Sequence, residues 1–165
     1  MKATFKIILG VLFVAVGAIL SAGHAAESIV GTWRLISQTT EDSESKAIEK
    51  VFGDKPIGFL TYTSEGRMTI IITHSTRKPP ASAKATEAEA AHLYGTMVAY
   101  AGTYRINGDK IIHHIEASWN EAWNGTDQER FAEVRDNRLT IYSPPFVSPT
   151  LGRRIDSKLV WERIP

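Results

Sequence analysis

Polar side chains occur at regular positions within apolar, alternating runs of the chain. His74 follows Ile72 at two-residue spacing, and His113 lies at the same spacing between Ile111 and Ile115. Side chains two apart in a strand share a face, so both histidines are expected to point into a core. Imidazole changes its charge near neutral pH, which makes each histidine a candidate for proton transfer or ligand contact. A hydrogen-bonded structural histidine is the alternative at either position.

Arg130 lies in a run that sorts its side chains by charge. Glu129 and Glu133 define a charged face, which leaves Arg130 on the opposite, more apolar face with Gln128. Desolvating a guanidinium is costly, and arginine cannot escape by losing its proton. An inward Arg130 therefore requires an anionic partner, which is either the head group of a ligand or an internal acid such as Glu116. A position at the rim of the fold is the third alternative.

Aromatic residues extend this set. Tyr62 follows Leu60 on the expected inner face of its strand, and Tyr104 shares its inner face with Ile106. Trp123 lies in the segment 117–127, which is rich in Asn and Gly and also contains a second tryptophan. A loop with exposed indoles can cap the mouth of a cavity, or the indoles can pack as a satellite cluster. The predicted ligand-binding residues are Tyr62, His74, Tyr104, His113, Gln128, Arg130 and Trp123.

The neighbouring histidines His113 and His114 suggest a metal site, with His74 and Glu116 as further ligands. Adjacent residues of a strand point to opposite faces, so the pair cannot chelate one ion without a bulge. The chain also has no cysteine. The sequence therefore predicts no metal site, and no motif indicates another cofactor.

Short β-rich runs separated by turn residues must position these side chains. The expected strands cover 29–38, 58–63, 67–74, 128–135, 138–143 and 158–163, with a hairpin over 102–118 that turns at Asn107-Gly108. The acidic segment 41–49 is expected to be a loop, and Pro144-Pro145 to end a strand because proline donates no hydrogen bond. Eight such strands with local connections predict a closed antiparallel barrel, which has no exposed edges and has room for a small ligand.

One helix interrupts the strands. Thr86 precedes Glu89 by three residues in an alanine-rich segment, and this capping-box spacing predicts a helix over about 86–97. The fold class is therefore all-β, with one helix inserted between hairpins.

The first 26 residues differ from the rest in composition. Lys2 and Lys6 precede an apolar run over 7–20, and small residues follow to Ala26. This pattern is typical of a signal peptide, and the run is shorter than the roughly 20 residues that span a bilayer. We expect cleavage near Ala26, export to the periplasm or the medium as a domain of residues 27–165, and no stable membrane anchor afterwards.

The charge balance argues against nucleic-acid binding. The chain of 165 residues has 19 basic and 18 acidic side chains, a net charge of +1, and no basic cluster. Such a surface has no long-range field that would hold a phosphate backbone.

Several runs resemble the bacterial and fungal lipocalin-like domain family. They are GTWRL at 31–35, FLTYTSEGRM at 59–68, AYAGTY at 99–104, HHIEASWN at 113–120 and GTDQ at 125–128. The resemblance implies a β-barrel with a ligand cavity, in which Trp33 closes one end and Arg163 covers that tryptophan. Typical lipocalins have a helix after the last strand, whereas the one helix expected here lies between the first hairpins, so their ligands do not transfer to this chain.

The expected function is the binding of a small, largely apolar molecule with a polar or acidic head group inside the barrel. The alternative is a cofactor-independent isomerase, cyclase or dehydratase, in which His74 or His113 moves protons and Tyr104 or Arg130 stabilises developing negative charge. An envelope interaction protein with a filled barrel is a third class. One fold hosts many functions, so the site must decide between them.

Overall fold

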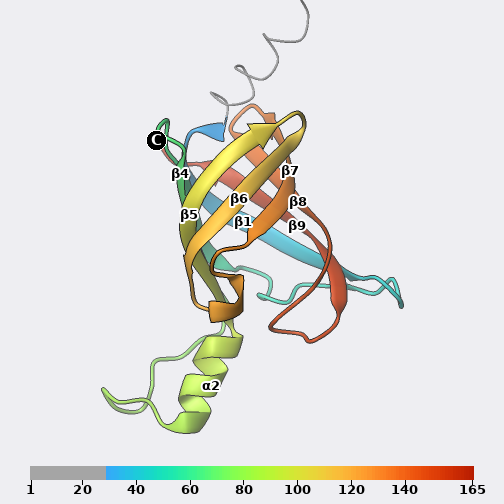
Figure 1. Ribbon diagram of the computed structural model, residues 1–165. Coiled ribbons are helices and arrows are strands. Elements are labelled where there is room, and N and C mark those ends of the chain that lie inside the picture. Colours follow the sequence, from blue (N-terminus) through green and yellow to red (C-terminus); the bar gives the residue numbers. More distant parts are fainter. Residues whose placement is uncertain (1–28) are drawn as a thin grey trace, which may run out of the picture.

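A computed structural model describes residues 29–165, and the predicted signal peptide at 1–26 lies outside them. Nine strands form one antiparallel sheet that curls into a barrel (Figure 1). In chain order they are β1 (Gly31–Asp42), β2 (Ile48–Glu49), β3 (Ile57–Tyr62), β4 (Arg67–Thr73), β5 (Met97–Asn107), β6 (Lys110–Ser118), β7 (Asp127–Arg135), β8 (Arg138–Val147) and β9 (Arg154–Arg163).

Pairing between β1 and β9 closes the barrel. The sheet order is β2-β1-β3-β4-β5-β6-β7-β8-β9, and β1 also pairs with β9 from Trp33↔Arg163 to Asp42↔Ile155. Eight strands therefore form the closed wall. The short β2 pairs with β1 at Thr40 and Glu41, near the carboxyl end of β1. The predicted closed eight-stranded antiparallel barrel is confirmed, and closure leaves those eight strands without a free edge along their paired lengths.

Strand alternation places the side chains largely as predicted. On β4, Met68, Ile70 and Ile72 are buried, while the residues between them are exposed. On β7, Arg130 is buried and its neighbour Glu129 is exposed. The predicted inner faces of these strands are correct because a strand with one buried face keeps its register.

Two predicted boundaries are wrong because bulges let strands continue. The acidic segment was expected to be a loop from residue 41, but β1 extends to Asp42 after a register shift between Leu35 and Ser37. The two prolines at 144–145 do not end β8, which continues to Val147 across a second shift between Ser143 and Phe146. A bulge leaves residues outside the ladder, so it can accommodate residues that donate no hydrogen bond.

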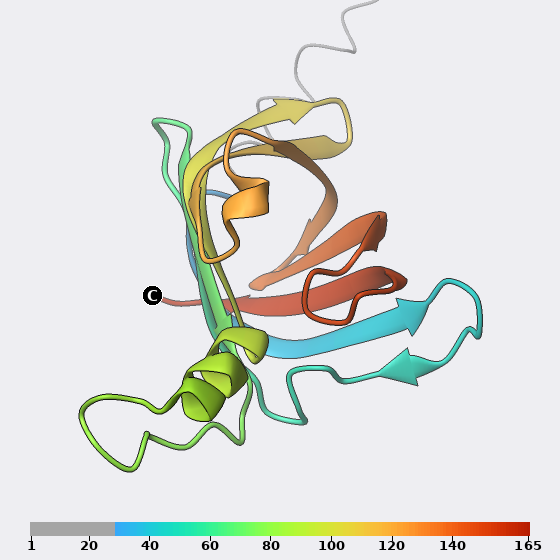
Figure 2. The same ribbon diagram turned by 60° about the horizontal axis from the view of Figure 1, so that its bottom comes forward.

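The inserted helix α2 (Glu87–Gly95) lies apart from the barrel wall (Figures 1 and 2). Thr86 accepts a hydrogen bond from the Glu89 amide, and the Glu89 carboxylate accepts one from the Thr86 amide, so the predicted capping box is confirmed. The helix ends at Gly95 rather than near residue 97, because Met97 already pairs with Thr73 as the first residue of β5.

One end of the barrel is filled by side chains. Trp33 is fully buried, and its indole N–H donates to the Ile29 carbonyl at 2.8 Å. The Arg163 guanidinium lies 4.1 Å from the centre of the Trp33 ring and donates to the Val30 carbonyl at 2.6 Å. A Cβ on Gly31, whose φ is +134°, would come within 2.6 Å of that guanidinium. The Gly-x-Trp spacing thus lets Arg163 cover Trp33, as the family resemblance implies.

Within residues 29–165 the structure contains no helix with the length and apolar character needed to cross a membrane.

Candidate functional site

A cavity occupies the barrel interior away from Trp33. Its lining includes residues of the β8–β9 connection and residues 51–52, which follow the end of β1 that is opposite to Gly31. The empty space is about 690 Å³ when the open mouth is included. The cavity has room for a small molecule.

Apolar side chains make up much of the cavity wall. Aliphatic residues contribute from four strands, β4, β5, β8 and β9, and aromatic rings contribute from both the wall and the mouth. The aliphatic lining is Val51, Ile70, Ile72, Val98, Ile141, Ile155 and Leu159, and the aromatic lining is Phe52, Tyr100, Trp123, Phe146 and Trp161. Such a surface favours the apolar body of a ligand, because its burial removes apolar area from water.

Arg130 contributes a positive charge to this apolar cavity. Its side chain lines the cavity, and the residue is only 7% exposed. Nη1 donates to the Glu129 carbonyl at 2.7 Å, and no carboxylate of residues 29–165 forms an ion pair with the guanidinium. Glu116, the internal partner considered from sequence, instead forms two 2.8 Å hydrogen bonds with Arg67 on the outside of the barrel. Neither the Glu116 pairing nor the rim position is correct, and the cavity guanidinium has no counter-ion among residues 29–165.

His113 lies beside Arg130 in a fully buried hydrogen-bond chain. Its Nε2 lies 2.7 Å from the Tyr62 hydroxyl, and its Nδ1 lies 3.1 Å from the Tyr100 hydroxyl. Burial, and to a lesser degree the charge of Arg130, holds the pKa of His113 well below 6.5. The imidazole is therefore neutral at pH 7, so it accepts a hydrogen bond from one tyrosine and donates one to the other.

Tyr62 and Tyr100 differ in their access to the cavity. Burial, reinforced by the neighbouring Tyr100, raises the pKa of Tyr62 well above 10, so its phenol stays protonated. Tyr100 lines the cavity, whereas Tyr62 does not. The chain Tyr62–His113–Tyr100 thus links a buried phenol to the ligand space through one imidazole.

His114 points outward, as strand alternation predicts. Its Nδ1 lies 2.8 Å from Asp127, which also accepts a hydrogen bond from Arg105. Hydrogen bonds from Arg105 and His114 lower the pKa of Asp127 below its usual value. The two adjacent histidines therefore belong to different environments, and residues 29–165 contain no group of three side chains suited to holding a metal ion.

Besides Tyr62, three predicted site residues do not line the cavity: His74, Tyr104 and Gln128. His74 lies in the loop after β4, where its Nδ1 bonds with Thr76, so the prediction that it faces the interior is wrong. Tyr104 packs edge-on against Tyr62 and donates to the Thr63 carbonyl at 2.8 Å, which places it towards the filled end. Gln128 bonds with Thr126 at the start of β7. The strands cross the barrel obliquely, so an inward side chain near a strand end can lie above or below the cavity.

Trp123 lies at the mouth, in the short helix η1 (Glu121–Trp123). Its ring packs edge-on against Trp119, Tyr100 and Phe146, with centroid distances of 5.0, 5.7 and 6.4 Å. Trp119 does not line the cavity and also contacts Tyr94 of α2. The loop 117–127 therefore contributes one indole to the cavity and one to a satellite cluster.

An ionic cluster connects the chain segments around the mouth. Arg153, in the β8–β9 connection, donates to Asp42 at the end of β1 and to Glu49 on β2. Hydrogen bonds from the Ser45 amide, from Arg153 and from the Ser45 hydroxyl hold the pKa of Asp42 far below its usual value. The Asp42 carboxylate is thus ionised at neutral pH and fixes the β8–β9 connection beside the cavity.

Sequence reasoning missed six polar residues of the cavity lining: Gln38, Thr40, Ser143, Ser148, Thr150 and Ser157. Gln38 and Thr40 face inward only because the bulge after Leu35 changes the alternation of β1. Ser157 precedes the predicted start of the last strand. Tyr100 was also missed, because the strand that contains it was predicted to begin at residue 102, whereas β5 begins at Met97. A small polar residue near a strand end carries no periodic signal that identifies it as lining.

Comparison with known proteins agrees with this architecture. A family model described as a lipocalin-like domain matches residues 30–164, which is nearly the whole described chain. No curated protein sequence matches the chain. The family match therefore identifies the fold and the general type of site, whereas the ligand depends on the chemistry of this cavity.

Proposed function

This chain belongs to the lipocalin-like domain family, and we propose that it binds a small, largely apolar molecule with an acidic head group inside the barrel. The fold is suited in general to holding small hydrophobic molecules in its interior. The acidic head group and the residues that contact it are the specific part of the proposal.

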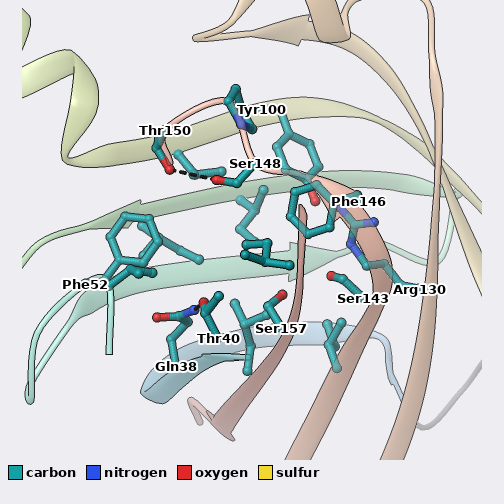
Figure 3. A pocket seen from close by; sticks show the side chains of 18 of the residues that line it. Gln38, Thr40, Phe52, Tyr100, Arg130, Ser143, Phe146, Ser148, Thr150 and Ser157 are labelled. Carbon is teal, nitrogen blue, oxygen red and sulfur yellow. Dashed lines mark hydrogen bonds between the residues drawn. The ribbon is translucent and has the colours of Figure 1, made fainter. Parts of the chain in front are cut away.

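The observation that supports the acidic head group is Arg130. A guanidinium that is 7% exposed, among apolar side chains and without a carboxylate partner in the described part of the chain, is electrostatically unfavourable. A ligand carboxylate, phosphate or sulfonate would remove that cost and accept hydrogen bonds from the planar donor fork. Figure 3 shows Arg130 with Ser143 and Phe146 around the same part of the cavity. The head group would bind at the guanidinium.

The apolar lining would bind the body of the ligand. Each square ångström of apolar surface that leaves water contributes roughly 25 cal/mol. Ile70, Ile72 and Val98 line the cavity from β4 and β5, and Trp123 lies at its mouth. Head group and body would therefore bind to different parts of one cavity, which is the arrangement expected for an amphiphile.

Calorimetry with matched probes tests this proposal. Decanoate and decanol differ only in the head group, and each is titrated into wild-type protein and into Arg130→Met. Methionine keeps much of the apolar stem but has no donor fork. We expect Arg130→Met to bind decanoate more weakly by at least about 1.5 kcal/mol, the low end for a hydrogen bond to a charged group. Decanol should lose less, and equal losses for both probes would contradict a head-group role for Arg130.

The chain Tyr62–His113–Tyr100 favours a second candidate function, proton transfer to a bound molecule. Tyr100 lines the cavity and can exchange its proton with His113, and Arg130 could stabilise an enolate formed nearby. Such a reaction needs no cofactor, as in an isomerase. Nuclear magnetic resonance in D₂O tests it with a 3-oxo acid as probe. Faster deuterium exchange beside the carbonyl with wild-type protein than with Tyr100→Phe supports catalysis, and equal rates favour binding alone.

We also propose that the protein is exported and released. The support is the sequence pattern of Lys2, Lys6 and the apolar run over 7–20. Amino-terminal sequencing of material from the producing cell should give a mature start at Ala26 or Glu27. Recovery of intact Met1 in the membrane fraction would overturn this proposal.

A further inference from the structure

We propose that the ligand is an oxygenated acid, which has a hydroxyl or carbonyl group in addition to its acidic head. This inference rests on the proposed function and names the class of ligand more closely. It is drawn from one side of the cavity wall, where polar side chains follow four adjacent strands. We call these residues the polar belt: Gln38, Thr40, Ser157, Ser143 and Arg130.

The register of the sheet makes the polar belt continuous. Thr40 on β1 pairs with Ser157 on β9, and Ser157 pairs with Ser143 on β8. Ser143 in turn follows Tyr142, whose partner Phe131 comes directly after Arg130 on β7. In Figure 3 the labelled side chains of Gln38, Thr40, Ser157, Ser143 and Arg130 follow one another along the wall. The belt therefore leads from the proposed head-group site across β8 and β9 to β1.

Much of the hydrogen-bonding capacity of the belt is unused within the described chain. Gln38 and Ser143 are only 4% and 5% exposed. The hydroxyls of Ser143 and Ser157 make no hydrogen bond to another residue of the range 29–165. Gln38 donates through Nε2 to the Thr40 hydroxyl, but its Oε1 is buried without a partner. Reversing the amide would leave Nε2 unpaired instead, so one end of Gln38 lacks a partner in either orientation.

A plain alkyl chain that lies on the belt satisfies none of its hydrogen bonds, although Ile141 and Leu159 line the cavity from the same two strands as the serines. Buried polar groups in folded proteins are nearly always hydrogen-bonded, to protein or to water. An apolar chain against the belt would displace water without replacing its hydrogen bonds, and this weakens binding. A ligand hydroxyl both donates and accepts, and a carbonyl accepts, so either can bond with the serines; a hydroxyl can also donate to Gln38. The belt therefore selects an oxygen function on the body of the ligand.

The opposite wall limits how polar the ligand can be. Ile70, Ile72 and Val98 line the cavity from β4 and β5, across the barrel from β8 and β9. A sugar or another molecule that is polar on all sides would leave its own groups unpaired against this wall. The two walls together fit a molecule with one oxygenated edge and one apolar edge.

The belt also constrains where the oxygen function lies. Adjacent strands are roughly 4.8 Å apart, so β7 and β1 are separated along the wall by three such spacings. The Arg130 side chain extends from β7 into the cavity and shortens this span. An oxygen atom bound to Ser157 or Gln38 must therefore be separated by several bonds from an acid bound to Arg130, which excludes a hydroxyl directly beside the acid carbon.

A double-mutant cycle between protein and ligand hydroxyls tests the inference. The probes are decanoate and its monohydroxylated isomers, one for each position along the second half of the chain. The proteins are wild type, Ser143→Ala/Ser157→Ala, and a control Ser64→Ala/Ser82→Ala, which removes two exposed hydroxyls outside the cavity lining. Dissociation constants are measured by calorimetry, and circular dichroism checks that each variant is folded.

We expect at least one hydroxy acid to bind wild-type protein about tenfold more tightly than decanoate, the equivalent of one or two hydrogen bonds. Ser143→Ala/Ser157→Ala should reduce that advantage to about threefold or less, while the control variant keeps it. Decanoate itself should bind Ser143→Ala/Ser157→Ala at least as tightly as wild type, because fewer polar side chains then lose hydrogen bonds to water when the alkyl chain binds.

The outcomes separate this inference from the proposed function. If decanoate binds through Arg130 but no hydroxy acid gains affinity, or if the gain survives in Ser143→Ala/Ser157→Ala, the oxygenated ligand is wrong and acid binding stands. If decanoate binds no better than decanol, the acidic head group is wrong. The same cycle with decanol and the corresponding diols then decides whether the belt binds an oxygen function.

Discussion

The two ends of the barrel use arginine and tryptophan in opposite ways. At the filled end, the Trp33 indole donates to Ile29, and Arg163 lies on the Trp33 ring and donates to Val30. Around the cavity, the Trp161 indole N–H is buried without a partner, and Arg130 has no carboxylate within the described chain. The same residue types are thus bonded within the protein at one end and left available at the other.

This difference distinguishes structural from functional polar groups. A buried polar group with protein partners stabilises the fold, whereas one without partners reduces stability until a ligand supplies them. The filled end should therefore contribute mainly to folding, and the cavity end mainly to binding. Substitutions at matched positions of the two ends can test that division.

The largest expected effect is at Trp33. Trp33→Ala should lower the free energy of unfolding by roughly 3–5 kcal/mol, because it removes a fully buried ring and leaves a cavity. Trp123→Ala should cost clearly less, since Trp123 is half-buried at the mouth, although its contacts with Trp119 and Phe146 are lost. Urea denaturation of both variants measures this difference. Equal destabilisation would show that the mouth is as structural as the filled end.

The next effect is a pH dependence that arises beside the cavity. The folded state holds the pKa of His113 well below 6.5. Between that lowered pKa and 6.5, His113 is protonated in the unfolded chain but neutral in the folded protein. The unfolding free energy should therefore fall as pH decreases below about 6.5, by up to about 1.4 kcal/mol per pH unit. Above that pH, His113 should add no further dependence.

Substitution identifies the residue responsible for this slope. Denaturation between pH 5 and 7 is compared for wild type, His113→Gln and the control His92→Gln on the exposed surface of α2. The slope should flatten only in His113→Gln. An unchanged slope in that variant would place the titrating group elsewhere in the molecule.

The smallest expected effect compares the two arginines without ligand. Arg163→Met should lower stability by about 1–2 kcal/mol, because it removes the cation–π contact with Trp33 and the hydrogen bond to Val30. Arg130→Met should be no less stable than wild type, since it removes a buried charge that no carboxylate of residues 29–165 pairs with. Thermal melting of the empty proteins measures both. A marked loss in Arg130→Met alone would make Arg130 a structural residue.

Much of the fold could be predicted from local patterns. Alternation identified the buried faces of β4, β6 and β7, the capping box located the start of α2, and the spacing of short strands indicated a closed barrel. These predictions succeeded because the signal lies within a few residues of the feature it describes. The inward position of Arg130 follows from the charged face opposite it.

The candidate site was only partly predictable. Of the seven predicted residues, the three that line the cavity are His113, Arg130 and Trp123. His74 has the spacing of the inner face of β4, but β4 ends at Thr73 and His74 lies in the loop that follows. The height of a residue within the barrel depends on strand tilt and stagger, which no single strand encodes.

The sequence alone therefore determined the barrel, its helix and the inward charge of Arg130, because strand periodicity and charge segregation are local properties. Only the tertiary structure decided which inward residues meet. The pairing of β1 with β9 joins residues far apart in the chain, so Thr40 lies beside Ser157 and, through it, beside Ser143. The bulge after Leu35 turned Gln38 and Thr40 inward, and barrel closure aligned them with Arg130. A site of this kind arises from the register between distant strands, which is fixed by packing across the whole barrel.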